Sequence, residues 1–401
     1  MRPFDGRRVL LGVTGGIASY KSAWLARLLA TSGAEVDTVL TRAAREFIGA
    51  ITFEALTGRP VHTALLDEGH ALDHIKLARA ADAIVVAPAT ADFLARAAQG
   101  RADDLLTACL LATDAPVLLV PAMNDRMWAH AQTQRNVEHL RALGYHVLEP
   151  DEGPLAVGEG SGPGRMPEPE SILAHVGRVL ERDAALEGRR VVITAGPTRE
   201  PLDPVRFLSN RSSGKMGVAL ASAAWRRRAD VTLIAGPLAV PVPPGVQLIP
   251  VETTEEMAAA VEQTLPTADL LIMAAAPADF RAAQPAARKI KKAVAPRAIA
   301  LAEAPDILVA TRGARRNGAV VVGFALETED AIEGGRQKLA AKDLDLIVVN
   351  DATEAGAAFG VDTNRVTLID RQGNEDRLPL LTKSDVADAI LDRTAVLLHG
   401  R

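Results

Sequence analysis

The sequence predicts an α/β protein with two doubly wound domains, and two observations carry this prediction. Residues 6–16 and residues 188–196 share one plan, in which a turn glycine and two arginines precede an apolar strand that leads into threonine and glycine. Each segment is followed by a helical stretch and a second apolar strand, at residues 36–40 and 231–235. Buried strands that alternate with helices are typical of parallel sheets.

The domain boundary is predicted from the segment that joins the two halves. Residues 153–169 are rich in glycine and proline, which indicates a loop, and residues 171–186 have helical periodicity. We therefore expect domains at residues 1–187 and 188–401. Further short apolar runs are predicted strands, at residues 83–87, 117–120, 270–274, 320–323 and 346–349.

Composition excludes several classes of function. Apolar residues make up 48% and charged residues 24% of the 401 residues, as in ordinary globular domains, and the length suits roughly two of them. The net charge of −5 argues against nucleic-acid partners and anionic membrane surfaces, which need a basic excess. The arginine triplet at residues 226–228 is interpreted as the solvated end of a helix, where cations suit the helix dipole.

Cysteine usage and hydropathy indicate a cytoplasmic protein. The single cysteine, Cys109, excludes an internal disulfide and a zinc site built from several thiolates. No apolar run approaches the roughly 20 residues of a membrane-spanning helix. The amino-terminal residues show no secretory pattern, so we expect a cytoplasmic location.

A candidate phosphate site follows the first predicted strand. Residues 14–20 contain small side chains between a strand and a helix, which allows backbone N–H groups and the helix dipole to meet an anion. The dinucleotide fingerprint is missing. The second strand ends in Thr41 and Arg42, a hydroxyl and a cation, where a dinucleotide site needs an acid for the ribose. We therefore expect a mononucleotide such as FMN.

Three more segments follow in order, at residues 88–92, 121–124 and 162–166. With the phosphate loop they resemble the phosphopantothenoylcysteine decarboxylase family over about residues 5–180. The resemblance implies a flavodoxin-like, homo-oligomeric FMN enzyme, in which His74 is catalytic and Asn124 contacts the substrate carboxylate. It also implies a set of FMN contacts from the loops after the strands: Gly15, Gly16, Ile17, Ala18, Thr41, Pro88, Ala89 and Thr90.

His74 has a structural and a catalytic interpretation. A single histidine flanked by Ile75 and Leu77 is more often structural, but the family motif favours catalysis. An imidazole changes charge near neutral pH and can take a proton from a substrate thiol. By the resemblance, flavin then accepts a hydride, and the thioaldehyde that results lets CO₂ leave.

One position departs from the decarboxylase pattern. The family has a cysteine before residues 162–166 that protonates the last intermediate, whereas this chain has Val157. Cys109 lies in a predicted helix at residues 105–112 and is interpreted as a core residue. Three hypotheses stay open: Glu159 or water donates the proton, the unit decarboxylates but reduces poorly, or it is a retained flavin-binding and oligomerising domain.

The second half is distinguished by its lysines. The chain has 45 basic residues but only nine lysines, and six of these lie between residues 215 and 342. Lysine offers a compact point charge that suits a triphosphate. Lys338 and Lys342 are four residues apart in a predicted helix and so share one face. Helix carboxyl ends also favour lysine, but the clustering of six favours a function.

A P-loop is excluded in this half. Residues 212–216 contain a Gly-Lys pair, but Ser209 stands where the motif needs glycine and Met216 stands where it needs serine or threonine. The nucleotide site is therefore of another kind.

Five segments, at residues 194–200, 203–206, 209–217, 274–280 and 289–292, resemble phosphopantothenate–cysteine ligase. The resemblance covers most of residues 188–400 and implies a Rossmann-like domain. The whole chain resembles the family of bacterial bifunctional coenzyme A biosynthesis proteins. That family joins 4′-phosphopantothenate to cysteine through an acyl-cytidylate made from CTP with Mg²⁺, and then decarboxylates phosphopantothenoylcysteine to 4′-phosphopantetheine.

The ligase resemblance also implies residue roles. Asn210 contacts the acyl-cytidylate and Lys289 neutralises its phosphate. Ala304 replaces an asparagine that usually precedes residues 305–306 in the family. Metal ligands are not assigned. The remaining expected residues line or border the CTP site: Ala274, Ala275, Asp279, Pro305, Asp306, Ile307, Phe324, Lys338 and Lys342.

Three rival functions remain at this point. The chain could be a ligase alone with a retained flavin-binding oligomerisation domain, or a flavin or nicotinamide oxidoreductase of unknown substrate. A binding or scaffold protein with a degenerate flavin domain is the non-enzymatic alternative. Bound FMN and CTP-dependent release of pyrophosphate distinguish these possibilities.

Overall fold

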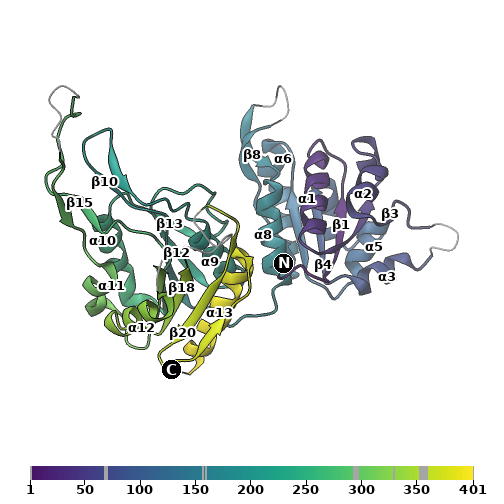
Figure 1. Cartoon of the computed structure of the whole chain (residues 1–401). Helices are drawn as coiled ribbons and strands as arrows, with labels where there is room; N and C mark the ends of the chain where they lie inside the picture. The colour runs from purple at the N-terminus through teal and green to yellow at the C-terminus, as the bar shows by residue number, and fades with distance from the viewer. Residues whose placement is uncertain are drawn as a thin grey trace. The chain divides into compact units, whose positions relative to one another are not determined.

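A computed structural model describes residues 2–66, 71–155, 158, 160–291, 298–327, 330–351 and 360–400. The chain divides into two compact units, Met1–Glu181 and Arg182–Arg401 (Figure 1). Both units are α/β, as the sequence predicts, and each is described separately below.

The amino-terminal unit contains a sheet of six parallel strands in the order β3-β2-β1-β4-β5-β6. The chain passes outward from β1 to β3, returns to the centre and passes outward again from β4 to β6. Strand order therefore reverses between β1 and β4, which is where ligands bind in open sheets of this kind. The strands are β1 Arg8–Val13, β2 Glu35–Leu40, β3 Val61–His62, β4 Ala83–Ala89, β5 Val117–Pro121 and β6 His146–Val147.

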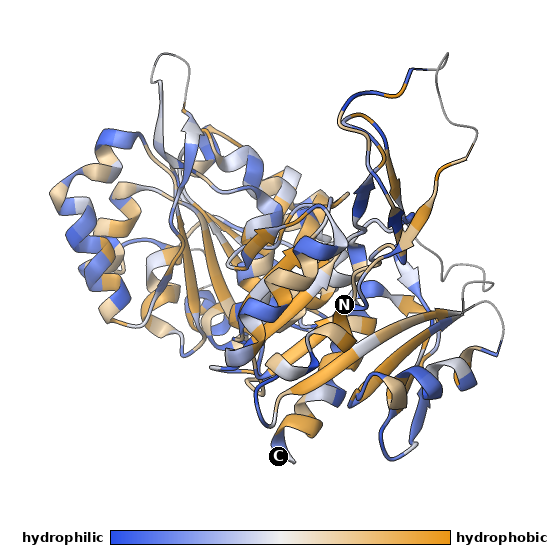
Figure 2. Ribbon diagram, turned by 90° about the vertical axis from the view of Figure 1, so that its left-hand side faces the viewer, coloured by the Kyte–Doolittle hydropathy of each residue, from blue (hydrophilic) through white to orange (hydrophobic). Residues whose placement is uncertain are grey.

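Helices cover both faces of this sheet. Alternate residues of β1 explain why, because Val9 and Leu11 pack into one buried cluster and Leu10 packs into another. The first cluster includes residues of α1 Ser19–Thr31, α2 Ala50–Thr57 and α8 Pro169–Leu180. The second includes residues of α3 Asp73–Ala80, α4 Ala91–Ala98, α5 Leu105–Ala112 and α7 Ala131–Ala142. Figure 2 shows the strands as mainly hydrophobic ribbons and the helices as mixed ones.

The carboxyl-terminal unit contains a mixed sheet of eight strands, in the order β13-β12-β9-β14-β17-β18-β20-β21. Strand order reverses between β9 and β14. The first six strands are parallel, whereas β20 runs antiparallel to β18, and β21 runs antiparallel to β20. The strands are β9 Arg190–Ala195, β12 Asp230–Ala235, β13 Gln247–Pro250, β14 Leu270–Met273, β17 Val320–Glu327, β18 Leu346–Asp351, β20 Val366–Asp370 and β21 Glu375–Arg377.

The antiparallel edge corrects the expectation of purely parallel sheets. Strands β20 and β21 are joined by a short turn, and an antiparallel pair needs no helical crossover. The helices of this unit are α9 Lys215–Arg226, α10 Thr254–Thr264, α11 Ile307–Ala310, α12 Ala331–Ala341 and α13 Lys383–His399. Short strand pairs complete it: β10 Arg199–Pro201 with β11 Phe207–Ser209, β15 Phe280–Ala282 with β16 Leu301–Glu303, and β19 Thr363–Asn364 with β22 Leu381–Thr382.

Two local predictions between the halves are wrong. The expected loop at residues 153–169 contains part of an antiparallel pair, β7 Asp151–Pro154 with β8 Ser161–Arg165. Its glycines and prolines have low strand propensity, so cross-strand pairing and not composition forms it. The expected helix at residues 171–186 ends at Leu180, because Glu181 has an extended backbone. Leu186 is buried beyond the end of the helix.

The arginine triplet at residues 226–228 does end a helix, but the expectation that it is solvated is wrong for Arg226, whose side chain is 11% exposed, and for Arg227, whose guanidinium is the more buried of the two. This guanidinium is fully buried. It lies 3.1 Å from Asp388 Oδ1 and 2.7 Å from Asp392 Oδ1, both on α13. A buried cation needs such partners, so Arg227 fastens α9 to the carboxyl-terminal helix.

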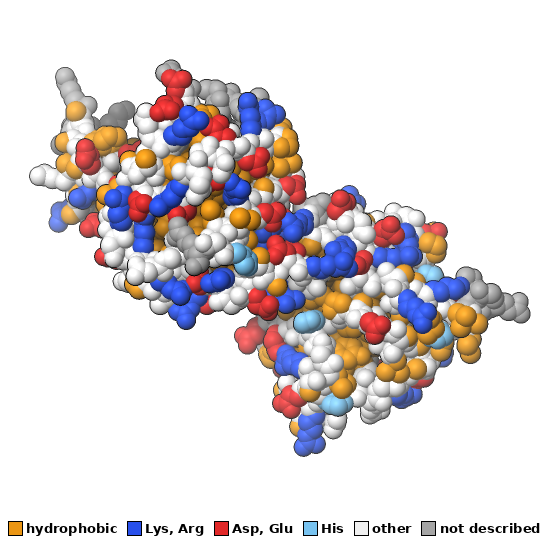
Figure 3. Space-filling model, turned by 90° about the horizontal axis from the view of Figure 1, so that it is seen from below, with side chains coloured by type: hydrophobic (Ala, Val, Ile, Leu, Met, Phe, Trp, Pro, Cys, Tyr) orange, Lys and Arg blue, Asp and Glu red, His pale blue; other side chains and the backbone are white. Residues whose placement is uncertain are grey.

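The surface has mixed charge, and Figure 3 shows lysine and arginine side chains lying among aspartates and glutamates on the face that it draws. Among the described residues, no helix has both the length and the apolar content needed to cross a membrane.

Candidate functional site

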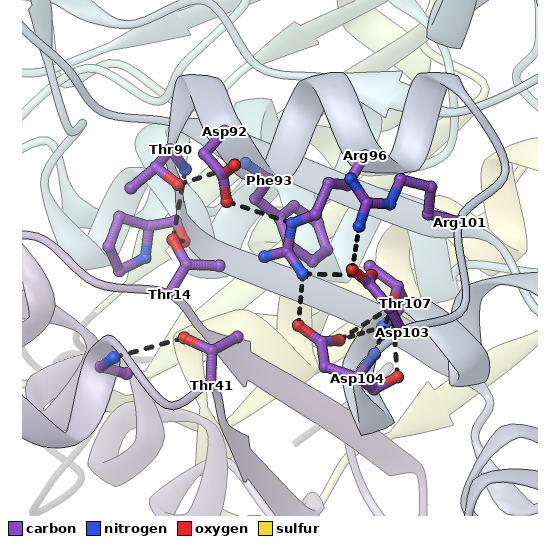
Figure 4. Close-up of polar contacts among 12 residues, drawn as sticks. Thr14, Thr41, Thr90, Asp92, Phe93, Arg96, Arg101, Asp103, Asp104 and Thr107 are labelled. Carbon is purple, nitrogen blue, oxygen red and sulfur yellow. Dashed lines mark hydrogen bonds and ion pairs between the residues drawn. The ribbon is translucent and has the colours of Figure 1, made fainter. Parts of the chain in front are cut away.

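The carboxyl ends of β1, β2, β4 and β5 bring several predicted residues to one edge of the first sheet. Thr14 connects two of these ends, because its Oγ1 donates to Pro88 O at 2.7 Å and accepts from Thr90 N at 3.2 Å. Thr90 in turn caps α4 by accepting from Phe93 N at 3.3 Å (Figure 4). The loop after β1 and the turn after β4 are therefore joined across the point where strand order reverses.

The predicted phosphate loop lies at this same edge. A Cβ added to Gly15 would lie 2.4 Å from Ala43 Cβ, so only glycine permits this close approach to the chain after β2. Thr41 is buried at that end of β2, and its Oγ1 accepts from Ala44 N at 3.3 Å. Helix α1 begins without a side-chain cap, although Ser19 N and Lys21 N donate to Gly16 O and Ala18 O at 3.0 Å. The positive end of the helix dipole favours an anion here. These residues fit the phosphate of a mononucleotide.

A second polar cluster connects α4 to α5, and sequence analysis did not identify it. Arg96 lies 2.6 Å from Asp104 Oδ2 and 3.1 Å from Asp92 Oδ2 (Figure 4). Asp104 also accepts from Thr107 N at 2.8 Å and caps α5. Burial alone would raise the pKa of Asp104, but the hydrogen bonds from Thr107 and Arg96 outweigh it and lower that pKa.

His74 lies near the start of α3 and lines an apolar cavity of about 460 Å³. Its Nδ1 is buried and has no hydrogen-bond partner among the described residues. The other residues that line the cavity are Leu65, Leu66, Ala71, Ile75, Ala102, Ala108, Leu111 and Ala112, so the predicted FMN contacts do not line it. The cavity that His74 lines is therefore separate from the phosphate loop in this chain.

Cys109 occupies the predicted helix α5 and is buried, as expected of a core residue. Its Sγ donates to His74 O at 3.5 Å. Burial, together with the nearby Asp104 carboxylate, raises the pKa of Cys109 to about 12. A thiol with this pKa is a poor acid. The position of the expected thiol, Val157, and the alternative donor Glu159 lie outside the described residues.

Asn124 caps the short helix α6 Asp125–Ala129, where its Oδ1 accepts from Arg126 N at 2.9 Å. The amide N–H donors of Asn124 are the groups that suit a substrate carboxylate. The neighbouring Met123 donates from its backbone N to Gly164 O at 3.0 Å. This bond joins the predicted segments 121–124 and 162–166.

The carboxyl-terminal unit contains a cavity of about 620 Å³ at the carboxyl ends of β14, β17 and β18. It lies at the point where strand order reverses in the second sheet. Of the predicted residues, the cavity is lined by Asn210, Ala274, Ala275, Asp279, Pro305, Asp306, Ile307, Phe324, Lys338 and Lys342.

Side chains from the ends of β9 and β11 hold the loop that contains Asp279. Ala275 N donates to Thr194 Oγ1 at 3.1 Å, and Ala278 N donates to Thr198 Oγ1 at 2.9 Å. Asn210 Nδ2 donates to Ala276 O at 3.1 Å and to Pro277 O at 3.0 Å. Because these donors are occupied, the free polar atom of Asn210 is its Oδ1.

Lys338 and Lys342 lie at the end of α12, as their spacing predicts. Lys342 Nζ is 2.9 Å from Asp306 Oδ2, and Asp306 also caps α11 by accepting from Val309 N at 3.2 Å. The predicted CTP residues on α11 and α12 are therefore in direct contact with one another.

Lys289 is the predicted site residue that does not line this cavity; its side chain is exposed. The chain beside it is anchored, because Ile290 N donates to Asp203 Oδ2 at 3.1 Å and Arg206 donates to Ile290 O at 2.9 Å. The same Arg206 guanidinium holds the pKa of Asp203 well below its usual range. Lys292 lies outside the described residues.

Some residues of the cavity were missed by sequence analysis. Asn350, Asn364 and Lys383 line it, and Asn350 Oδ1 is buried without a hydrogen-bond partner among the described residues. Lys383 carried a signal, because lysine is rare in this chain. The two asparagines carried none. Within the described residues, no group of three or more His, Cys, Asp or Glu side chains is placed to hold a metal ion.

Comparisons with known proteins cover nearly the whole chain. Residues 2–181 match the family described as "Flavoprotein", and residues 186–397 match the "DNA/pantothenate metabolism flavoprotein C-terminal domain". The chain is 48% identical to the "Coenzyme A biosynthesis bifunctional protein CoaBC" of Mycobacterium tuberculosis, over 98% of this chain and 97% of that protein. The proteins of the same name from Vibrio cholerae and Bacillus subtilis are each 44% identical, over 98% of both chains.

A solved structure of the carboxyl-terminal domain of a CoaBC protein is 38% identical. It covers 54% of this chain and 100% of that chain, with a TM-score of 0.47.

Proposed function

The chain belongs to the family of bifunctional coenzyme A biosynthesis proteins, and we propose that each of its units catalyses one reaction of the pair. The carboxyl-terminal unit ligates 4′-phosphopantothenate to cysteine with CTP. The amino-terminal unit, with FMN bound, decarboxylates the resulting phosphopantothenoylcysteine to 4′-phosphopantetheine.

The observation that carries the ligase proposal is the cavity at the carboxyl ends of β14, β17 and β18. Ten residues predicted from separate parts of the sequence line it together. Lys338 and Lys342 supply the cations that a triphosphate needs, and Phe324 supplies an aromatic face for a base. The cavity therefore offers both the volume and the positive charge that a nucleoside triphosphate and a small carboxylic acid require.

Two bonds form in the proposed ligation. A carboxylate oxygen of 4′-phosphopantothenate attacks the α-phosphorus of CTP, and the bond to pyrophosphate breaks. The cysteine nitrogen then attacks the acyl carbon, CMP leaves with the electron pair, and the nitrogen loses a proton. Negative charge grows on phosphoryl oxygens, so the lysines stabilise the transition state most.

Mg²⁺ is proposed to enter with the nucleotide. In nucleotide sites Mg²⁺ binds phosphate oxygens together with water and one or two carboxylates. Asp279 is the described carboxylate of the cavity loop that could add a ligand.

For the decarboxylase, the phosphate of FMN is proposed to lie on the loop of Gly15–Ala18, beside Thr41 and the turn at Pro88–Thr90. Bound FMN supplies hydride transfer. His74 takes a proton from the substrate thiol, and the amide of Asn124 donates to the substrate carboxylate. Val157 has no proton to give, so we propose that Glu159 or water donates the last one.

A homo-oligomer is proposed because the amino-terminal unit exposes large apolar side chains near the phosphate loop. Ile17 and Tyr20 at the start of α1 are 69% and 64% exposed, and Ile51 on α2 is 77% exposed. Apolar patches of this kind mark interaction sites. A neighbouring copy would cover them and could complete the site around His74.

The proposed pair of functions is tested with the purified protein. Flavin absorbance that is released as FMN on denaturation supports the amino-terminal assignment. Release of pyrophosphate that requires 4′-phosphopantothenate and CTP together supports the ligase. A protein that binds FMN but releases no pyrophosphate would lack the ligase function, and the flavin oxidoreductase and binding-protein alternatives would remain.

Lys289→Gln is predicted to abolish amide formation while leaving the fold intact, because the ammonium would no longer neutralise the phosphate of the acyl-cytidylate. Amide product is measured by mass spectrometry, and folding by circular dichroism. Arg288→Gln, which removes an exposed cation that directly precedes Lys289 and lies outside the ligase motif, is the matched control and should keep its activity. Substantial ligase activity in Lys289→Gln would refute the role.

A further inference from the structure

The ligase cavity contains a second pair of lysines besides Lys338 and Lys342. Lys215 is the first residue of α9, Lys383 is the first residue of α13, and both line the cavity. Neither has a role in the reaction described above. Two lysines at one place are notable in a chain that has 45 basic residues and only nine lysines.

Both ammonium groups are held by one turn, at residues 360–362. Lys215 Nζ donates to Asp362 Oδ1 at 2.6 Å and to Gly360 O at 3.0 Å. Lys383 Nζ donates to Val361 O, and its backbone N donates to Asp362 O at 2.9 Å. One carboxylate thus faces two cations, which leaves an excess of positive charge. In agreement, burial and the adjacent Lys215 lower the pKa of Lys383.

The start of α9 adds to this positive field. Its first residues line the cavity, and the helix has twelve residues and no side-chain cap, so N–H groups of the first turn are available. Gly214 allows the close packing here, because it has a φ of +77° and a Cβ on it would lie 2.3 Å from Leu238 Cδ2. The two lysines and the helix dipole therefore act on the same part of the cavity.

We propose that Lys215 and Lys383 bind the phosphomonoester of 4′-phosphopantothenate and make the ligase select the phosphorylated acid. This inference rests on the proposed ligase function. The substrate has an anion at each end, and its carboxylate must reach the α-phosphorus of a nucleotide whose phosphates lie with Lys338 and Lys342. Its phosphate, a dianion, then needs a separate group of cations.

Asp362 holds Lys215 until substrate binds. Its side chain is 87% exposed, so it can turn into solvent when a phosphate takes its place. The pKa of this carboxyl is lowered by the hydrogen bond from Lys215, which keeps it ionised and able to orient the ammonium at neutral pH.

The test compares the Michaelis constants of the two substrates in Lys215→Met and in Lys383→Met. Initial rates of pyrophosphate release are measured in the full-length protein, with 4′-phosphopantothenate and CTP varied in turn. Loss of one charged hydrogen bond to phosphate should raise the KM for 4′-phosphopantothenate at least about tenfold. The KM for CTP should stay within about twofold of wild type.

The deciding quantity is the rise in KM for 4′-phosphopantothenate divided by the rise in KM for CTP. A ratio above about three in either variant supports the proposal, and a smaller ratio in both variants overturns it. Arg336→Gln removes an exposed cation of α12 that does not line the cavity and should leave both constants unchanged. Thermal melting of each variant shows whether it is folded. A wild-type protein that releases no CTP-dependent pyrophosphate would refute the ligase function itself, which is a separate result.

Discussion

At the scale of single residues, one threonine in each unit forms a side-chain hydrogen bond between the ends of two neighbouring strands. Thr14 follows β1 and joins it to the turn after β4, while Thr194 in β9 accepts from Ala275 N after β14. In both sheets this bond crosses the point where strand order reverses, and the candidate site lies there. A buried hydroxyl is suited to this role because it donates and accepts at once.

Thr194→Val is predicted to weaken both the fold and the ligase. Valine keeps the shape but leaves the partly buried N–H of Ala275 without this partner, which costs about 1 kcal/mol of unfolding free energy. The loop of Asp279 should loosen, so the KM for CTP should rise. Urea unfolding and initial rates measure the two effects. Thr194→Ser keeps the hydroxyl and should restore most of both, whereas equal behaviour of the two variants would contradict the role of the hydrogen bond.

Single residues also set the limit of sequence prediction. The strands, the phosphate loop and the rare lysines carry signals that are local in sequence, so they could be predicted. Arg227 could not, because its partner Asp388 is 161 positions further on, and only the folded chain reveals that the guanidinium is buried. Asn350 gave no signal either, since the use of an asparagine depends on the cavity around it.

At the scale of elements, the contacts between helices hold the sites in place. Asp104 directly precedes α5, and its carboxylate caps this helix and also binds Arg96 of α4. Thr90 in the predicted FMN turn caps α4, and α5 carries Cys109, which contacts His74 O. Helices α4 and α5 thus connect the predicted FMN turn to His74 through the Asp104 carboxylate.

Asp104→Asn is predicted to destabilise the protein in a pH-dependent way. The folded-state pKa of Asp104 is below its ordinary value of about 3.9, so its stabilisation is complete above that pH and is lost as the pH falls through the folded-state pKa. The variant should lose about 1–2 kcal/mol at pH 7. The difference from wild type should shrink below about pH 4.

Thermal or urea unfolding at pH 7 and at about pH 3 measures this difference. Asp103→Asn is the matched control, because the Asp103 side chain is 43% exposed and a surface ion pair contributes little. An equal loss for Asp104→Asn at both pH values would show that its charge does not stabilise the fold.

Element types were easier to predict than element limits. The predicted strand at residues 320–323 is the longer β17 Val320–Glu327, which places Phe324 within a strand. The antiparallel strands β20 and β21 were not predicted. Strand β21 consists of three exposed polar residues at the sheet edge and has no apolar run, whereas β20 is short and buried, and its direction is set by pairing with β18. Cross-strand pairing with β18 forms this edge.

At the scale of the whole molecule, the chain combines two α/β units, each with a candidate site where its strand order reverses. The last helix, α13, connects the core of the carboxyl-terminal unit to the cavity, because it binds the buried Arg227 that follows α9 and begins with the cavity residue Lys383. The full-length similarity to bifunctional relatives agrees with two activities in one chain.

The most direct test of the account supplies the purified protein with 4′-phosphopantothenate, cysteine, CTP and Mg²⁺, and identifies the products by mass spectrometry. The account predicts 4′-phosphopantetheine and CO₂, with one CMP formed for each molecule of product. Accumulation of phosphopantothenoylcysteine without CO₂ would contradict the decarboxylase function. A reaction that forms neither phosphopantothenoylcysteine nor CMP would contradict the ligase function.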